Sequence, residues 1–503
     1  MKPTTAVCAK STSFCRRGLA VLVALSLATA VQAADPAESP IRPVTTTHKL
    51  VVGGKTVAYE ATFAEVPLGA DPSHPAATMS ATTYLRKGLT NVEGRPVIFV
   101  FNGGPGASST PLHLHALGPR RIKDPDDAHK APYLSDNPYS LIDVADLVFI
   151  DPVGTGLSRV LPGGDAHPYW SPDGDAKAIL GFIQGWLQEH HREQSPIYIM
   201  GESYGGYRLA TMMKLLGDQR VDGLIFVSAA LDFSASDEAK GNDQSFINNL
   251  PTMAAAAWYH NKVDRRGEAL EAFVAEADAY AMNEYATALQ LGDAITPEHR
   301  AAVAQKVASY IGLPADRIAH ANLRIGSEDY LNSLIAEKDL RVGRLDARET
   351  GPLHAKAPTG VPTNDPSLHV SQKVGINDQY FRNELGVPTD RRYVGLSFEV
   401  NGAWNWADDK GEEDGHRFYV NAAPFIGDAA RKQANMRVLL TGGLYDMATP
   451  WHGSRYAMER AGIPQGRLRE VAFPSGHSFY DGDERLKKFS DLLRDFVQHP
   501  ASP

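Results

Sequence analysis

The stretch that decides the fold is IYIMGESYGG, residues 197–206. Its first four residues are apolar and predict a short buried strand, and the segment from Tyr204 onward has helical spacing. A G-x-S-x-G turn between a strand and a helix is typical of a nucleophile elbow, because the glycines allow a tight turn that lifts the serine hydroxyl clear of the sheet. The sequence therefore predicts Ser203 as a catalytic nucleophile. The backbone N–H of Tyr204, at the start of the helix, is predicted as one donor of an oxyanion hole. The alternative is a tight turn whose glycines serve only packing.

Short apolar runs recur on both sides of this stretch and have the character of buried parallel strands. They lie at Pro96–Phe101, Leu147–Ile150 and Leu224–Val227, and a sheet-like signal returns at Met436–Thr441 and Leu468–Phe473. Helical patterns lie between or after them, at Asp173–Glu193, Tyr204–Leu216 and Glu484–Val497. Strands that alternate with helices predict a doubly wound α/β fold with a mostly parallel sheet.

The same pattern predicts one core with a large insertion. We expect a leader and antiparallel strands at 34–79, the first part of the core at 80–232, a mostly helical cap at 233–424 and the second part of the core at 425–503. Within the cap, helical spacing is clearest at Glu268–Leu289 and Pro297–Ile311, whereas residues 345–390 are rich in Pro, Gly and Thr and are predicted to be loop.

A second glycine cluster, NGGPGASS at residues 102–109, directly follows the first of the buried strands. In a hydrolase with this order of elements, the loop after that strand supplies the second oxyanion donor. Glycine allows the backbone to approach the acyl carbon without interference from a Cβ atom. We therefore expect the N–H of Gly104 to be that donor and the N–H of Gly103 to contact the substrate. The alternative is an ordinary strand–helix turn.

The acid and the base should follow the nucleophile in the chain if the order is Ser, Asp, His. Asp446 comes directly after the predicted strand 436–441, where a carboxylate can orient an imidazole at the edge of the sheet. His477 lies in a loop of small residues between the last predicted strand and helix. We expect His477 to take the proton from Ser203 and return it to the leaving group. Asp232, after the predicted strand 224–227, is the rival acid.

With these residues in place, the chain resembles the serine carboxypeptidase family (peptidase S10), in a bacterial exported form. The segments that carry the resemblance are NGGPGASS at 102–109, DPVGTGLS at 151–158, GESYGG at 201–206, and the surroundings of Asp446 and His477. The resemblance implies an α/β-hydrolase core with a helical cap inserted before the acid. It also implies that C-terminal residues are released from peptides through an acyl-enzyme on Ser203.

The resemblance further implies a clamp for the terminal carboxylate of the substrate. Asn102, Glu202 and the N–H of Gly103 match the family's carboxylate-binding residues. A glutamate can hydrogen-bond a carboxylate only when one of the two holds a proton, so such enzymes are expected to prefer acid. The alternative is that Glu202 is a buried structural carboxylate.

Some positions depart from the family's pattern. The usual tryptophan two residues before the asparagine, the glutamate before Leu-Gly-Pro, the cysteine after GGPG and the methionine after the histidine are here Val100, Ala116, Ala107 and Ser478. The first two departures remove an indole N–H and a carboxyl group from the clamp. Peptidase activity with weaker terminal recognition therefore stays open.

The amino terminus predicts export. Residues 1–33 combine four basic residues, an apolar run too short to span a bilayer and small residues before a cleavage site after Ala33. Both cysteines of the chain lie in this segment, so the predicted mature protein has none. Cleavage would also change the formal net charge from −9 to −13. We expect a periplasmic or secreted protein without stable membrane insertion.

Composition and motifs exclude several classes of partner. The 50 basic residues are outnumbered by 59 acidic ones, which argues against nucleic-acid binding. Neither a metal-ligand spacing nor a phosphate or dinucleotide loop occurs, so no metal or cofactor is predicted.

The expected partners are peptides with a free C-terminus. An esterase or acyltransferase with the same triad is the second hypothesis, and a non-catalytic binding protein on a hydrolase scaffold is the third.

Overall fold

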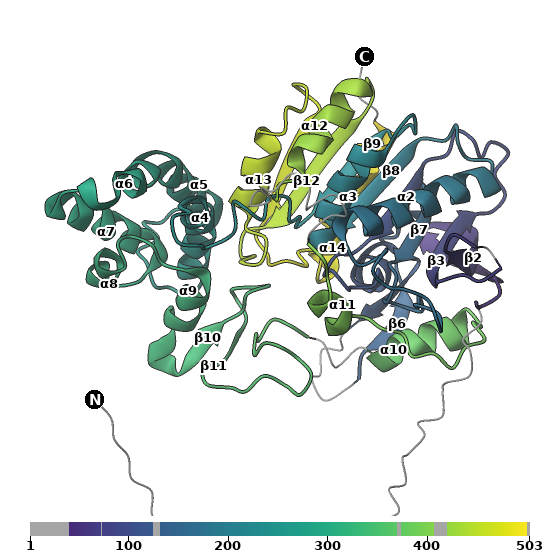
Figure 1. Ribbon diagram of the computed structural model, residues 1–503, viewed down its shortest axis with the longest axis horizontal. Helices are drawn as coiled ribbons and strands as arrows, with labels where there is room; N and C mark the ends of the chain where they lie inside the picture. The colour runs from purple at the N-terminus through teal and green to yellow at the C-terminus, as the bar shows by residue number, and fades with distance from the viewer. Residues whose placement is uncertain (1–39, 72, 124–130, 370–373, 407–419, 500–503) are drawn as a thin grey trace, which may run out of the picture. The chain divides into compact units, whose positions relative to one another are not determined.

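The computed structural model describes residues 40–71, 73–123, 131–369, 374–406 and 420–499 (Figure 1). The predicted signal peptide, residues 1–33, and its cleavage site lie outside the described residues. Among the residues that are described, no helix combines the length and the apolar character needed to cross a bilayer.

A nine-stranded sheet forms the centre of the described structure. Its strands are β1 (Val44–Val52), β2 (Lys55–Leu68), β3 (Ala77–Arg86), β4 (Val97–Phe101), β7 (Asp146–Asp151), β8 (Ile197–Glu202), β9 (Gly223–Val227), β12 (Arg437–Gly443) and β13 (Leu468–Phe473). They lie in the order β1-β2-β3-β7-β4-β8-β9-β12-β13. The first three pair antiparallel, β3 pairs antiparallel with β7, and all pairs from β7 to β13 are parallel. The predicted α/β fold with a mostly parallel sheet is confirmed.

Helices cover both faces of this sheet because each buried strand presents apolar side chains to both sides. In β4, Val97 and Phe99 belong to one core, whereas Ile98 and Val100 belong to the other. The first core includes apolar residues of α2 (Pro172–Glu189), α3 (Tyr204–Leu215) and α12 (Ala423–Lys432), and the second includes those of α14 (Asp483–Gln498). Figure 1 shows α2, α3 and α12 side by side on one face. The antiparallel strands β1 to β3 continue the same sheet, and β3 crosses the boundary predicted at residues 79 and 80.

The chain between β9 and β12 holds a group of helices with a hydrophobic core of its own. The helices are α4 (Gln244–Tyr259), α5 (Leu270–Tyr280), α6 (Ala286–Leu291), α7 (Pro297–Ile311), α8 (Ala315–His320) and α9 (Ser327–Ser333). The predicted helix 297–311 has the predicted bounds, whereas the predicted helix 268–289 is divided by a π-helical turn at Ala281–Tyr285.

Smaller elements complete the fold. They are α1 (Thr110–Leu112), α10 (Val374–Gln379), α11 (Phe398–Gly402), α13 (Trp451–Glu459) and the antiparallel pairs β5–β6 (Arg120–Lys123, Tyr133–Asp136) and β10–β11 (Leu340–Val342, Thr350–Pro352). Strand β11 lies within the stretch 345–390 that composition predicts to be loop, whereas β10 lies before it.

Candidate active site

Ser203 occupies the turn between β8 and α3 with a strained backbone, φ 60° and ψ −127°. Its N–H donates to Val227 O at 3.0 Å, and its carbonyl accepts from the N–H groups of Gly206 and Ala230 at 2.9 and 3.0 Å. A Cβ atom on Gly206 would overlap the side chain of Ala229. A positive φ at a non-glycine residue is costly and is held only where the surroundings enforce it. The structure thus has the backbone geometry expected of a nucleophile elbow.

Asp446 and His477 meet at the carboxyl ends of β12 and β13. His477 Nδ1 lies 2.7 Å from Asp446 Oδ2. The aspartate is fully buried, and its Oδ1 accepts from the N–H groups of Ala448 and Thr449 at 2.8 and 3.0 Å. A carboxylate at this position accepts the Nδ1 proton, which leaves Nε2 of the imidazole to act as a base.

The end of β9 brings the nucleophile loop and the histidine loop together. Val227 O accepts from Ser203 N, and the hydroxyl of the next residue, Ser228, donates to His477 O at 2.7 Å. Within the described residues no hydrogen bond joins Ser203 Oγ to the imidazole. Catalytic hydrogen bonds of this kind often tighten only when substrate is bound.

The pKa of His477 is raised. Burial lowers it, but the charge of Asp446 and its hydrogen bond, followed by the charge of Glu202, outweigh burial. The rival Asp232 has other partners: Oδ1 accepts from Ala235 N at 3.0 Å and Oδ2 accepts from Asn421 Nδ2 at 2.9 Å. Asp446 is therefore the carboxylate that orients the imidazole.

The glycine loop after β4 packs directly against the elbow. A Cβ atom on Gly103 would lie 2.5 Å from Gly205 N and would overlap Tyr204 N. Gly104 has φ +101°, a conformation that only glycine adopts readily, and Gly103 O accepts from Ala107 N at 3.0 Å. The backbones of the two predicted oxyanion donors, Gly104 and Tyr204, thus lie in adjoining segments.

Asp151 holds the far end of this loop in place, a role that sequence reasoning missed. Its Oδ1 accepts from the N–H and the hydroxyl of Ser109 at 2.8 and 2.7 Å, and its Oδ2 accepts from the hydroxyl of Tyr393 at 2.9 Å. A Cβ atom on Gly156 would overlap its carboxylate. The DPVGTGLS motif therefore contains the buried carboxylate that fixes the glycine loop.

Asn102, Glu202 and Tyr480 form a buried hydrogen-bonded group beside the nucleophile. Oε2 of Glu202 accepts from Asn102 Nδ2 at 2.7 Å and from the Tyr480 hydroxyl at 2.8 Å. Glu202 is only 2% exposed. Burial raises its pKa to about 7, although the charge of His477 and the two hydrogen bonds act in the opposite direction. Tyr480 was not predicted, because nothing in the local sequence around it indicates a contact with residue 202.

A buried ion pair between α2 and α3 contacts the backbone of Asn102. Arg208 of α3 is fully buried, and its Nε donates to Asp175 Oδ2 of α2 at 2.5 Å. Its Nη1 donates to the carbonyl of Asn102. Such a pair costs desolvation free energy, and removal of either partner would leave an uncompensated buried charge. The two helices therefore position Asn102 through its backbone.

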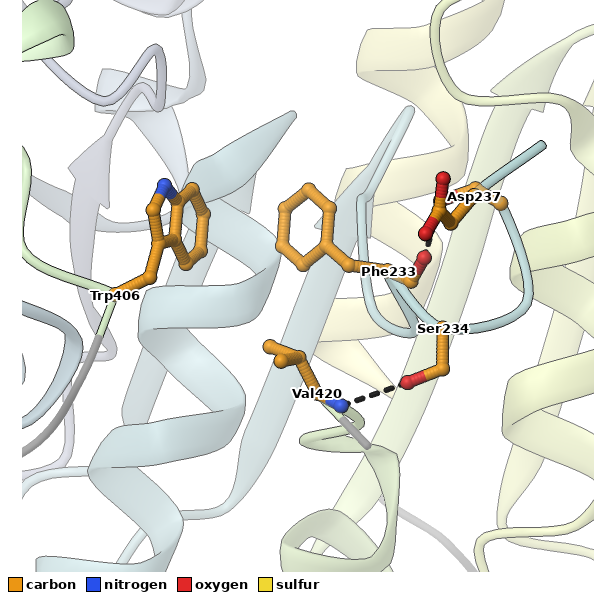
Figure 2. A pocket seen from close by; sticks show the side chains of 6 residues that line it. Phe233, Ser234, Asp237, Trp406 and Val420 are labelled. Atoms are coloured by element: carbon orange, nitrogen blue, oxygen red, sulfur yellow. Dashed lines mark hydrogen bonds between the residues drawn. The ribbon is translucent and has the colours of Figure 1, made fainter. Parts of the chain in front are cut away.

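A cavity of about 450 Å³ opens beside α3. Figure 2 shows Trp406 and Phe233 next to each other in its wall, in an edge-to-face contact with ring centroids 4.9 Å apart. The lining residues are Phe233, Ser234, Ser236, Asp237, Trp406 and Val420. Trp406 also contacts Tyr204, the residue after Ser203, with ring centroids 5.7 Å apart.

Within the described part of the chain, no group of three or more His, Cys, Asp or Glu side chains could hold a metal ion.

The sequence model of the serine carboxypeptidase family matches residues 84–474. The chain is 34% identical over 137 residues to serine carboxypeptidase-like 13 of Arabidopsis thaliana, which is 27% of this chain and 31% of that protein. It is 36% identical over 124 residues to a pheromone-processing carboxypeptidase of Sclerotinia sclerotiorum, 24% of this chain and 18% of that protein. These alignments span less than a third of either relative's length.

The fold is similar to the crystal structure of a prohormone-processing carboxypeptidase from Saccharomyces cerevisiae. The TM-score is 0.50 at 13% identity, over 87% of this chain and 90% of the other. This structural similarity places the fold in the α/β-hydrolase class. The family model matches most of the chain. The chain belongs to the serine carboxypeptidase family, peptidase S10.

Proposed function

We propose that this protein is an exported serine carboxypeptidase that releases the C-terminal residue of peptides through an acyl-enzyme on Ser203. The observation that carries the proposal is the burial of Glu202 and the raised pKa of its carboxyl group. This residue precedes the nucleophile, is buried, and has a pKa raised to about 7. A carboxyl group that keeps its proton near neutrality can donate a hydrogen bond to a carboxylate, which an ordinary glutamate cannot do.

The triad supplies the chemistry of acyl transfer. His477 takes the proton of the Ser203 hydroxyl as the oxygen attacks the scissile carbonyl, and Asp446 stabilises the imidazolium that forms. The N–H groups of Gly104 and Tyr204 stabilise the oxyanion. His477 then protonates the leaving amine, and water attacks the acyl-enzyme by the same route.

The clamp decides where the peptide is cut. The terminal carboxylate would accept hydrogen bonds from protonated Glu202 and from the N–H of Gly103, with Asn102 beside them. Val100 and Ala116, which replace the family's tryptophan and glutamate, are fully buried and carry no side-chain polar atom. Binding of the carboxylate therefore depends on fewer groups than in the usual pattern, and Tyr480 orients the remaining carboxyl group.

Export rests on residues 1–33, with cleavage after Ala33. Expression of the full chain in a Gram-negative host, followed by fractionation and N-terminal sequencing, tests it. We expect a periplasmic or extracellular protein that begins at Ala34. An intact N-terminus in the cytoplasmic fraction would contradict the proposal.

Digestion of a defined peptide library, followed by mass spectrometry at several pH values, tests the reaction itself. We expect loss of single residues from free C-termini, with the highest rates at acid to neutral pH and none for Ser203→Ala. Turnover of simple esters without any peptide cleavage would instead support the esterase or acyltransferase hypothesis. Labelling of wild type but not of Ser203→Ala by a fluorophosphonate identifies the nucleophile, and labelling of neither favours the binding-protein hypothesis.

A further inference from the structure

The loop of the β10–β11 hairpin, residues 343–349, docks on both catalytic loops. Met447 N, one residue after the catalytic aspartate, donates to Arg344 O at 3.0 Å. His477 N donates to Leu345 O at 2.7 Å. The backbone of Arg344 and Leu345 therefore lies next to Asp446 and next to His477 at the same time.

The hairpin loop is held there by its other charged residues. Arg348 pairs with Asp346 at 2.6 Å and donates to Ser475 Oγ at 3.0 Å. A Cβ atom on Gly476 would lie 2.5 Å from Asp346 Cβ, so the loop packs closely against the residue before the histidine. The position of the loop relative to the imidazole is thus fixed by contacts that do not involve the Arg344 side chain.

Arg344 differs from these neighbours because its side chain is not engaged. It is exposed, and no described residue hydrogen-bonds or pairs with its guanidinium. Its charge nevertheless acts on His477, whose pKa it lowers. An unpaired arginine on a fixed loop beside a catalytic imidazole is a preorganised group for binding an anion.

The surroundings of Arg344 indicate which part of a substrate it would meet. The charges that act most on the pKa of Glu202 are those of His477 and Asp481, and not that of Arg344. The carboxylate clamp therefore has charged neighbours other than Arg344. The imidazole protonates the leaving amine, which is the amino group of the released residue. A cation beside the imidazole therefore lies near the terminal residue, whose main-chain carboxylate is already bound by the clamp.

We propose that Arg344 binds an acidic side chain on the C-terminal residue of the substrate, so that the enzyme prefers peptides that end in Glu or Asp. The proposal rests on the carboxypeptidase function proposed above. A single charge-assisted contact of this kind, exposed to water, should favour Glu over Gln about twofold to fivefold in kcat/KM.

Three peptides of identical sequence that end in Glu, Gln or Lys test the preference. We expect the wild type to cleave them in the order Glu, Gln, Lys, and Arg344→Gln to reduce the Glu-to-Gln ratio of kcat/KM to about one. Arg344→Lys should keep part of the ratio, and Arg344→Glu should invert it. Because the ratio compares two substrates of one variant at one pH, changes in the triad itself cancel. Arg42→Gln, an exposed arginine beside the opposite edge strand β1, is the matched charge control and should keep the full ratio.

Two outcomes overturn the proposal while leaving the carboxypeptidase function intact. One is hydrolysis of all three peptides with a Glu-to-Gln ratio that Arg344→Gln does not change. The other is an effect of Arg344→Gln confined to peptides with Glu at the penultimate position, which would place the arginine on the acyl side. Failure of the wild type to release a terminal residue from any peptide would overturn the proposed function, and this inference with it.

Discussion

Asn102 Nδ2 donates a 2.7 Å hydrogen bond to Oε2 of Glu202, the residue immediately before the nucleophile. The two residues are 100 positions apart, but Asn102 directly follows β4 and Glu202 ends β8, and in these neighbouring parallel strands Val100 pairs with Met200 and Phe101 with Gly201. Strand register therefore brings Asn102 and Glu202, the residues of the proposed carboxylate clamp, together at the elbow. The proposed clamp lies at the carboxyl end of the sheet, and its geometry depends on the same two strands as the proposed nucleophile.

Glu202→Gln should change the pH dependence of kcat/KM in two ways. In the wild type, Glu202 with a pKa of about 7 loses its proton as the pH rises, so activity should fall on the alkaline side. His477, whose pKa is raised, must lose its proton to act as a base, so activity should also fall on the acid side. The apparent values belong to the coupled pair. The carboxamide donates at every pH and carries no charge, so the alkaline limb should disappear and the acid limb should move to lower pH.

Kinetics over a range of pH, with a peptide that ends in a neutral residue, measure both limbs. An alkaline limb that persists unchanged in Glu202→Gln would mean that the titration of Glu202 does not control binding of the terminal carboxylate.

Asp446→Asn should lower kcat by about 10⁴-fold, because a carboxamide neither holds the imidazole in the required tautomer nor stabilises its cation. The corresponding change at the rival, Asp232→Asn, is the control and should have a far smaller effect on kcat. Single-turnover acylation separates the chemical step from product release. Equal losses for the two variants would contradict the assignment of Asp446.

Gly103→Ala should reduce kcat severely, because the added methyl group would overlap the backbone of Tyr204 and Gly205 at the elbow. Gly181→Ala is the matched control. Gly181 is exposed in the middle of α2, and a Cβ atom there would contact nothing within 4 Å. That change should preserve kcat and stabilise the fold by up to about 1 kcal/mol. An active Gly103→Ala enzyme would show that the loop does not approach the elbow as closely as described.

Asp151→Ala should destabilise the protein by about 3–5 kcal/mol, because it leaves three buried donors on Ser109 and Tyr393 without their acceptor. Tyr393→Phe removes only one of the three hydrogen bonds and should cost about 1 kcal/mol. Urea denaturation measures the two free energies of unfolding. Similar values for both variants would refute a bracing role of Asp151 in the glycine loop.

Local patterns were sufficient to predict much of the fold and part of the site. β13 and α7 both have the predicted bounds. The elbow at Ser203 was predictable because its geometry requires glycines at fixed spacing. Asp446 was preferred over Asp232 for its place past the strand 436–441 at the edge of the sheet, and the hydrogen bond to His477 agrees with that choice.

Contacts between distant segments could not be predicted in this way. Tyr480 reaches Glu202 across 278 positions, and Tyr393 reaches Asp151 across 242, while neither tyrosine differs locally from a core aromatic residue. The strand β11 was missed because it falls in the stretch 345–390 that composition predicts to be loop, and composition does not record the backbone groups of Met447 and His477 that the hairpin loop bonds. The π-helical turn at Ala281 likewise has no signal in helical periodicity.

The most direct measurement compares one peptide with a free C-terminus and the same peptide with a C-terminal amide. Intact-mass spectrometry follows both with purified mature enzyme at pH 5 to 6, with Ser203→Ala as the blank. We expect stepwise loss of single residues from the free acid and a rate at least about tenfold lower for the amide, whose terminus cannot accept the clamp's hydrogen bonds as a carboxylate does. Equal rates for the two peptides, or cleavage at internal bonds, would contradict a clamp built on Glu202 and Asn102.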